Sequence, residues 1–306
     1  MPPTDLPGLA VLLAPFETAF FVRALLGGVL AAAICAIAGA WVVARGMAFL
    51  GEALGHGMLP GVAIATLLGG SPLAGAAVSA AAMAAGIGWL TRRRALRDDT
   101  AIGIAFVGML ALGVVVVSAS GSFATDVTAI LFGDVLAVRE PELVALAIGL
   151  AATALLATAL HRPITALAFD ERIAATLGLR PGLARVGLAA LVTVAVVASY
   201  QAVGTLLVVA LLVAPPAAAA LWTRSMLATM VLGAALGAAA VAAGLLGSWH
   251  LGTAAGASIA IAAVLAFAAS AGIRGLTDLR ARDGARTAPP TEQQTGAEGA
   301  LERSIA

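Results

Sequence analysis

Glu52 and His56 are the two side chains of this sequence best suited to hold an ion. They lie four positions apart in a long apolar stretch, so on a helix they share one face. Inside a membrane span such groups cost about 2.5–3.5 kcal/mol each, and they usually mark an ion path, a proton relay or a buried pair. A carboxylate beside an imidazole suits a divalent transition metal better than an alkali ion. The alternatives are a hydrogen-bonded pair that only fixes helix packing, and residues at the water interface.

The remaining candidates carry weaker signals. His161 adjoins Arg162 at the end of an apolar run, where a solvated histidine is the more common case. His250 follows Trp249, and tryptophan at the end of a span is typical of the aromatic belt at a membrane surface. Carboxylates in one connecting region could raise the local concentration of cations or could simply be solvated. These carboxylates are Asp126, Asp134, Glu140 and Glu142.

Composition places these residues in a membrane protein. Of the 306 residues, 61% are hydrophobic and only 11% are charged, whereas about a quarter of a soluble domain is charged. A helix of about 20 apolar residues crosses the hydrocarbon of a bilayer, and it satisfies its own backbone hydrogen bonds there. We therefore expect an all-α, polytopic transmembrane bundle of about nine spans. The spans are expected near 19–44, 53–70, 72–91, 100–119, 141–161, 183–199, 204–222, 227–247 and 254–273.

The arginines predict the orientation of this bundle. Cytoplasmic loops of membrane proteins are enriched in Lys and Arg. With 92–97 inside, alternation of the spans puts every arginine except Arg23 and Arg139 on the cytoplasmic side. The N-terminus is then outside and the C-terminus is cytoplasmic. The chain is expected to divide into an extracytoplasmic segment, a membrane domain and a disordered, polar cytoplasmic tail: 1–18, 19–275 and 276–306.

Two local signals add to this organisation. The cytoplasmic segment 169–178 opens with Asp170 and Glu171 and ends at Gly178, which are helix start and stop signals. Pro215-Pro216 interrupts the seventh span, because proline removes a backbone donor and kinks a helix. In transporters such a break often frees carbonyls near a pathway, and the alternative is a kink that serves packing alone.

The sequence predicts a transporter component rather than an enzyme. It contains no GxxxxGK[ST] phosphate loop, so the chain is not expected to hydrolyse ATP itself. No Ser or Cys nucleophile has a base nearby in sequence, and Cys35 is the single cysteine, so no disulfide framework exists. We expect no bound cofactor and no nucleic-acid partner, and energy for uphill transport must come from a partner or from an ion gradient.

Residues 45–63 resemble the second-helix signature of zinc, manganese and iron ABC-transporter permeases. That signature runs as Arg, then Gly-Asp-Ala-Leu, a small residue, His, and Leu-Pro-Gly-Val-Ala. The likeness covers about 20–275 in collinear order. Glu52 stands where the family has Asp, and its extra methylene changes the reach of the carboxylate. Further matching stretches are 98–103, 131–138, 169–179 and 202–215.

The resemblance implies the membrane subunit of an ATP-driven importer in the bacterial cell membrane. Such a permease works as a homodimer in lipid, with two ATPase subunits beneath it, which bind the ATP, and an extracytoplasmic solute-binding protein above. The resemblance supports Glu52 and His56 as residues on the path of a transported divalent metal, Zn²⁺, Mn²⁺ or Fe²⁺. It also implies that the cytoplasmic segment is the coupling helix that docks on the ATPase. The residues so implied are Asp170, Glu171, Ala174 and Gly178.

Three alternatives stay open at this point. An ABC permease could carry another solute, such as a metal chelate. A proton-driven secondary metal carrier could use Glu52 as its proton site, although a carrier has no ATPase for a coupling helix to dock on. A structural membrane protein would not need Glu52 and His56 within a span. One Glu and one His fit all three metals.

Overall fold

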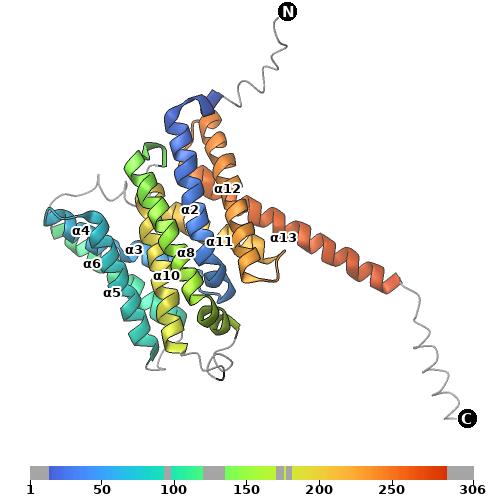
Figure 1. Ribbon diagram of the computed structural model, residues 1–306, viewed down its shortest axis with the longest axis horizontal. Helices are drawn as coiled ribbons and strands as arrows, with labels where there is room; N and C mark the ends of the chain where they lie inside the picture. Colours follow the sequence, from blue (N-terminus) through green and yellow to red (C-terminus); the bar gives the residue numbers. More distant parts are fainter. Residues whose placement is uncertain (1–13, 93–97, 120–134, 170–175, 177–180, 288–306) are drawn as a thin grey trace, which may run out of the picture. The chain divides into compact units, whose positions relative to one another are not determined.

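The protein is all-helical wherever its structure is described. The computed structural model describes residues 14–92, 98–119, 135–169, 176 and 181–287 (Figure 1). The helices are η1 (Ala14–Glu17), α2 (Ala19–Ala44), α3 (Phe49–Gly57), α4 (Leu59–Leu67), α5 (Pro72–Arg92), α6 (Asp98–Ala119), η2 (Val135–Ala137), α8 (Glu140–Phe169), α10 (Pro181–Val203), α11 (Thr205–Ala220), α12 (Met226–Leu251) and α13 (Ala255–Thr287). The predicted fold class is confirmed.

Seven helices of the described chain are long and apolar enough to cross a membrane: α2, α5, α6, α8, α10, α12 and α13. This confirms a multi-pass membrane protein. The remaining two expected spans have a different form. Residues 53–70 were expected as one span, but they form two short helices, α3 and α4, and α11 has only 16 residues. The count of nine crossings and the orientation stay predictions.

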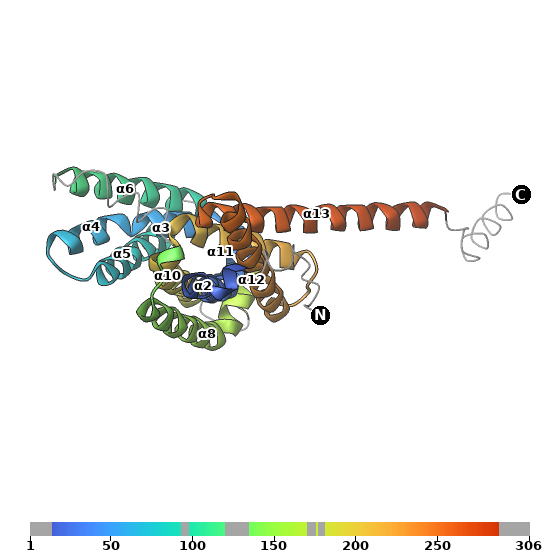
Figure 2. The same cartoon turned by 90° about the horizontal axis from the view of Figure 1, so that it is seen from above.

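Helix α2 lies at the centre of the bundle, in contact with α8, α10, α11 and α12 (Figure 2). Its own residues make this position possible, because small side chains let helix backbones approach closely where lipid gives no hydrophobic drive for association. Gly28 faces Val241 of α12 so closely that a Cβ at position 28 would overlap the valine. At the other end Trp41 fills the core and is fully buried.

The thiol of Cys35 is also part of this core. Cys35 is fully buried on α2, and its Sγ lies 3.7 Å from the carbonyl oxygen of Val208 on α11, to which it donates. Its position therefore fits the packing role of a small, weakly polar side chain.

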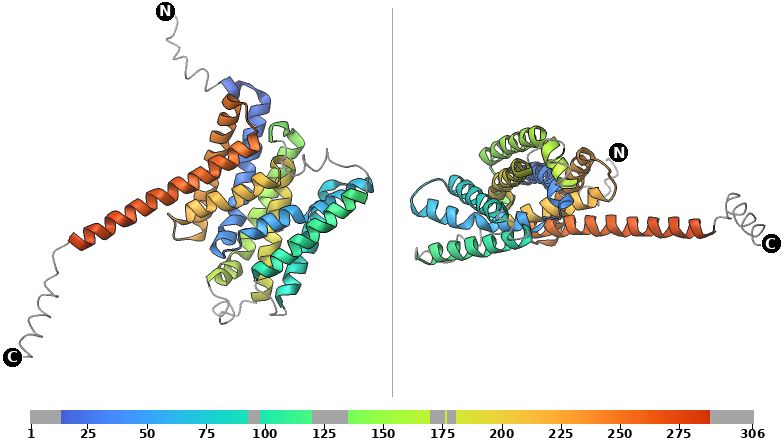
Figure 3. Two further views of the ribbon diagram at one scale, coloured as in Figure 1. Left: turned by 180° about the vertical axis from the view of Figure 1, so that it is seen from behind. Right: turned by 90° about the horizontal axis from the view of Figure 1, so that it is seen from below.

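The helices α3, α4, α5 and α6 pack on one another as a second group (Figure 3). Gly61 of α4 and Gly75 of α5 face each other, and a Cβ on either would overlap the carbonyl of the other. This close backbone approach requires glycine on both sides. The outward faces of α5 and α6 expose large apolar side chains such as Val78, Val107 and Val115, which suits contact with lipid tails.

Helix α11 runs through both prolines without ending. The sequence predicts an interruption at Pro215-Pro216, but α11 continues to Ala220. Because proline has no N–H, the carbonyl of Leu212 receives no helical hydrogen bond from Pro216. That carbonyl faces Gly39 of α2, where a Cβ would overlap it. Tight packing against α2 therefore holds α11 together at this point.

The chain divides into two compact units, one that ends at Phe267 and one that begins at Ala268. Helix α13 begins in the first unit and continues to Thr287. The first part of the segment expected as a disordered tail, 276–287, is therefore helical. Residues 288–306 lie outside the described part of the chain.

Candidate functional site

The candidate site lies on α3, which ends sooner than a full span would. Pro60 carries no N–H, so it cannot donate to the carbonyl of His56 four residues earlier. The helix ends at Gly57, and a new helix begins at Leu59. The hydroxyl of Ser79 on α5 donates to the carbonyl of Gly57 at 2.7 Å. The break therefore has a polar partner inside the protein, as non-helical backbone at membrane depth requires.

Glu52 and His56 form a direct pair on this helix. The Nε2 atom of His56 lies 2.9 Å from Oε1 of Glu52. The side chain of His56 is 23% exposed and that of Glu52 is 35% exposed, so the pair is accessible without being fully solvated. With the proton on Nε2, the imidazole donates to the carboxylate, and the Nδ1 atom keeps its lone pair. Nδ1 is buried and has no hydrogen-bond partner among the described residues.

Phe106 of α6 forms an aromatic wall beside the pair. Its ring centre lies 5.7 Å from the imidazole of His56 at an interplanar angle of 68°. The same ring meets Phe49 of α3 at 5.4 Å and 70°. Both are edge-to-face geometries that aromatic rings favour. The sequence does not single out Phe106, because an apolar residue within an apolar span gives no signal of such a contact.

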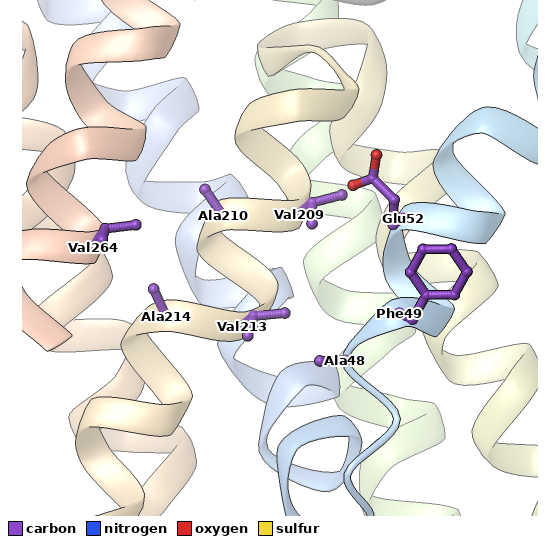
Figure 4. Close-up of a pocket in the computed structure, with 8 residues that line it drawn as sticks. All are labelled: Ala48, Phe49, Glu52, Val209, Ala210, Val213, Ala214 and Val264. Atoms are coloured by element: carbon purple, nitrogen blue, oxygen red, sulfur yellow. The ribbon is translucent and has the colours of Figure 1, made fainter. Parts of the chain in front are cut away.

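Glu52 also reaches an open groove of about 510 Å³ between α3, α11 and the first part of α13 (Figure 4). Among the described residues that line the groove, Glu52 is the one that carries charge, and the rest are apolar. The apolar lining residues are Ala48, Phe49, Val209, Ala210, Val213, Ala214 and Val264. Low-polarity walls strengthen the attraction of a carboxylate for a cation, because they exclude the water that would screen it.

The other candidates lie elsewhere in the fold. His161 of α8 packs edge-to-face on Trp41, with ring centres 5.7 Å apart. His250 near the end of α12 is exposed, and its Nδ1 lies 2.8 Å from the carbonyl oxygen of Leu246. Glu142 accepts a hydrogen bond from the backbone N–H of Arg139 at 2.9 Å at the start of α8. Each of these contacts fits a structural role.

Some predicted residues lie outside the described part of the chain. They are Asp126 and Asp134 of the acidic connection, and Asp170, Glu171, Ala174 and Gly178 of the expected coupling helix. Within the described part, no group of three or more His, Cys, Asp or Glu side chains gathers that could hold a metal ion. The Glu52–His56 pair therefore offers two ligand side chains. Any further ligands would come from water, from the backbone or from another chain.

The fold and site together define a multi-pass helical protein of the cell membrane with one polar pair beside an apolar groove. Residues 17–273 match the model of the ABC 3 transport family, and the chain belongs to that family.

Two relatives and one solved structure illustrate the similarity. The chain is 36% identical over 247 residues to the manganese transport system membrane protein MntC of Halalkalibacterium halodurans, covering 80% of this chain and 84% of the relative. It is 34% identical over 256 residues to the chelated iron transport system membrane protein YfeD of Yersinia pestis, covering 83% and 85%. The structure of PsaBC from Streptococcus pneumoniae in complex with Fab is similar at 32% identity and a TM-score of 0.75, covering 86% of this chain and 95% of that chain.

Proposed function

We propose that this chain is the membrane-spanning permease subunit of an ATP-driven importer for divalent transition-metal ions, with Mn²⁺ and Fe²⁺ as its substrates. The observation that carries the proposal is the pairing of Glu52 with His56 beside the groove, in a chain of the ABC 3 transport family. Relatives named for manganese and iron transport support the choice of metals.

The choice of metal rests on the relatives rather than on the distance within the pair. The 2.9 Å between Nε2 of His56 and Oε1 of Glu52 is an ordinary hydrogen-bond distance. One carboxylate and one imidazole fit Mn²⁺, Fe²⁺ and Zn²⁺ alike, so the preference for Mn²⁺ and Fe²⁺ is supported by the relatives named for manganese and iron transport.

Binding of the metal would replace the shared proton of the pair. When Nε2 carries the proton, the imidazole must change tautomer, with its proton on Nδ1, before Nε2 can coordinate the metal. The carboxylate of Glu52 then stays beside the positive ion rather than beside the imidazole N–H. Because this chain offers two side-chain ligand atoms there, water or a second copy of the chain completes the coordination of the metal.

The proposed assembly follows from the family. A homodimer of this chain binds two ATPase subunits on the cytoplasmic side, through the coupling helix expected at 170–178, and a solute-binding protein on the outer side. Closure of the ATPases around ATP moves the coupling helices and alternates access to the Glu52–His56 pair between the two faces. Cofactors are absent from this scheme, and the energy of ATP enters through the partner.

The proposed topology has nine crossings, with the N-terminus outside. Helices α3 and α4 together count 18 residues, about 27 Å at 1.5 Å per residue, and cross as one broken span. Helix α11 spans about 24 Å with its 16 residues. Both lengths lie slightly below the hydrocarbon thickness of about 30 Å. Most of α11 is covered by other helices, whereas α4 exposes Ile64 and Leu67.

The test is uptake of radioactive Mn²⁺ into vesicles that contain the permease with its ATPase and binding protein. Glu52→Gln and His56→Ala should each lower uptake about tenfold or more, because ligands of a metal path are lost. The matched controls are Glu17→Gln, an exposed glutamate of η1, and His250→Ala, an exposed histidine of α12. Both controls should keep uptake near that of the wild type. Wild-type uptake in both site variants would remove Glu52 and His56 from the path.

A competition arm of the same assay separates the metals. Excess unlabelled Mn²⁺ and Fe²⁺ should suppress uptake at lower concentrations than Zn²⁺. Suppression by a ferric chelate instead of by the free ions would favour the metal-chelate alternative.

A further inference from the structure

The C-terminal ends of α2 and α8 are joined by two polar contacts. The indole Nε1 of Trp41 donates to Oγ1 of Thr165 at 3.1 Å. The guanidinium of Arg45 donates from Nη1 to the carbonyl oxygen of Leu167 at 2.8 Å. We refer to these four residues as the α2–α8 contact. The same helices also meet where the ring of Trp41 packs edge-to-face on His161.

Arg45 binds the last described turn of α8. Helix α8 is described up to Phe169, and Leu167 lies two residues before that point. A hydrogen bond from a charged donor is about twice as strong as one between neutral groups. The guanidinium of Arg45 therefore joins the end of α2 firmly to this turn of α8.

Arg45 is also the first residue of the turn that leads into α3. Gly46 adopts a φ of 66°, and the backbone N–H of Met47 donates to the carbonyl of Val42 at 2.9 Å. The Nε atom of Arg45 lies 3.3 Å from Sδ of Met47. Four residues then separate the end of α2 from the start of α3, whose first turn contains Glu52. These hydrogen bonds define the short path from Arg45 to Glu52, although Gly46 and Ala48 are themselves exposed.

The α2–α8 contact is buried at its two apolar members and half-buried at the others. Trp41 is 0% exposed and Leu167 is 2% exposed, whereas Arg45 and Thr165 are half-buried. Closely packed interiors have low compressibility and transmit strain. A shift of the end of α8 should therefore act on the end of α2 through these residues.

We propose that the α2–α8 contact, with Arg45 as its charged member, couples movement of the end of α8 to the Glu52–His56 pair. Arg45 acts as a positioning residue, through α3, and does not touch the transported metal. The inference rests on the proposed function, in which the segment that directly follows α8 receives the movement of the ATPase. It assigns a role to Arg45 that packing alone does not require.

The test measures coupling in the complex of permease, ATPase and binding protein in vesicles. Mn²⁺ uptake and ATP hydrolysis are recorded together for wild type, Arg45→Met, Arg45→Lys and the control Arg162→Met. Met keeps an apolar stem and removes every donor, whereas Lys keeps the charge and can still donate to a carbonyl. Arg162 is an exposed arginine of the same helix end of α8.

The expected result is uncoupling. Mn²⁺ transported per ATP hydrolysed should fall about tenfold in Arg45→Met while ATP hydrolysis stays within about twofold of wild type. Arg45→Lys should recover part of the ratio, and Arg162→Met should keep it. Should Arg45→Met not assemble, Thr165→Val decides, because it keeps the shape of the side chain and removes the oxygen that accepts from Trp41; it should lower the ratio about threefold.

Three results would overturn the inference. One is a wild-type ratio in Arg45→Met, or in Thr165→Val where that variant decides. Another is an equal fall of uptake and ATP hydrolysis, which is what a purely structural role produces. The third is a loss of ratio in Arg162→Met as large as in Arg45→Met. Absence of Mn²⁺ uptake by the wild-type complex would overturn the proposed function as well, so the two failures are distinguishable.

Discussion

Two proline-bearing segments of this protein behave in opposite ways. At Pro60 the chain ends one helix at Gly57 and begins another at Leu59. At Pro215-Pro216 the helix α11 continues through two successive prolines. Each proline removes the same backbone donor, so the residue itself does not account for the difference.

The difference lies in what surrounds the carbonyls at each proline. Pro60 frees the carbonyl of His56, and at the next residue the hydroxyl of Ser79 donates to the carbonyl of Gly57, where the helix ends. In α11 the carbonyl of Leu212 is pressed against Gly39 of α2, which leaves no room for the helix to open. A polar partner from another helix stabilises a break, whereas close apolar packing preserves the helix. The break in turn sets the end of the helix that carries Glu52 and His56.

The largest expected effect on stability is that of Gly39→Val, which disrupts the packing of α11 against α2. A side chain at this position overlaps the Leu212 carbonyl and Pro216, so overpacking should lower the free energy of unfolding by about 3 kcal/mol. Thermal unfolding of the purified protein in detergent measures this. The control is Gly108→Val on α6, where an added Cβ meets nothing within 4 Å. Equal stability of the two variants would mean that α11 does not depend on α2 for its continuity.

Ser79→Ala should have a smaller effect, at the other proline. It removes the donor to the carbonyl of Gly57 and leaves that carbonyl without its partner on α5. The expected loss is about 1–2 kcal/mol in the free energy of unfolding. Thr158→Ala is the control, because the exposed Thr158 hydroxyl bonds only within its own helix, to the carbonyl of Leu155. An unchanged unfolding transition in Ser79→Ala would contradict a stabilising role for this hydrogen bond.

Pro60→Ala should change stability least of the three substitutions, and it tests whether transport needs the break between α3 and α4. The new N–H can bond to the carbonyl of His56, so the free energy of unfolding should rise by no more than about 1 kcal/mol. Joining α3 to α4 should nevertheless lower Mn²⁺ uptake, because the end of the helix beside His56 is lost. Thermal unfolding and vesicle uptake are measured on the same preparation. Full uptake in a variant of unchanged or raised stability would show that the break is not needed for transport.

Much of this architecture is predictable from the sequence, because a helix that crosses lipid needs a continuous apolar run of about 20 residues. Apolar runs of sufficient length mark the helices, and eight of the nine expected segments each follow one helix, while 53–70 is divided between α3 and α4. Glu52 and His56 stand out because ionisable residues at helical spacing are expensive in an apolar run. Their direct pairing follows from that spacing and is observed at 2.9 Å.

The remainder depends on contacts between residues far apart in the chain. The hydrogen bond from Ser79 to Gly57 and the fit of Gly39 to Leu212 decide where helices break, and neither residue pair has a sequence signature. Phe106 and the apolar wall of the groove are of the same residue types as those that face lipid. Hydropathy treats both surfaces alike, so only the packing of the helices distinguishes them.

The burial of Cys35 has a practical consequence for studying movement in this protein. Its thiol is fully enclosed between α2 and α11, and this is the single cysteine of the chain. Thiol-reactive dyes and spin labels should therefore leave the folded wild-type protein unmodified. A cysteine introduced on the exposed Phe49 or Val264 can then be labelled specifically in the otherwise native chain. Opening and closing beside Glu52 thus become measurable by fluorescence or by spin–spin distances, without first replacing a core residue.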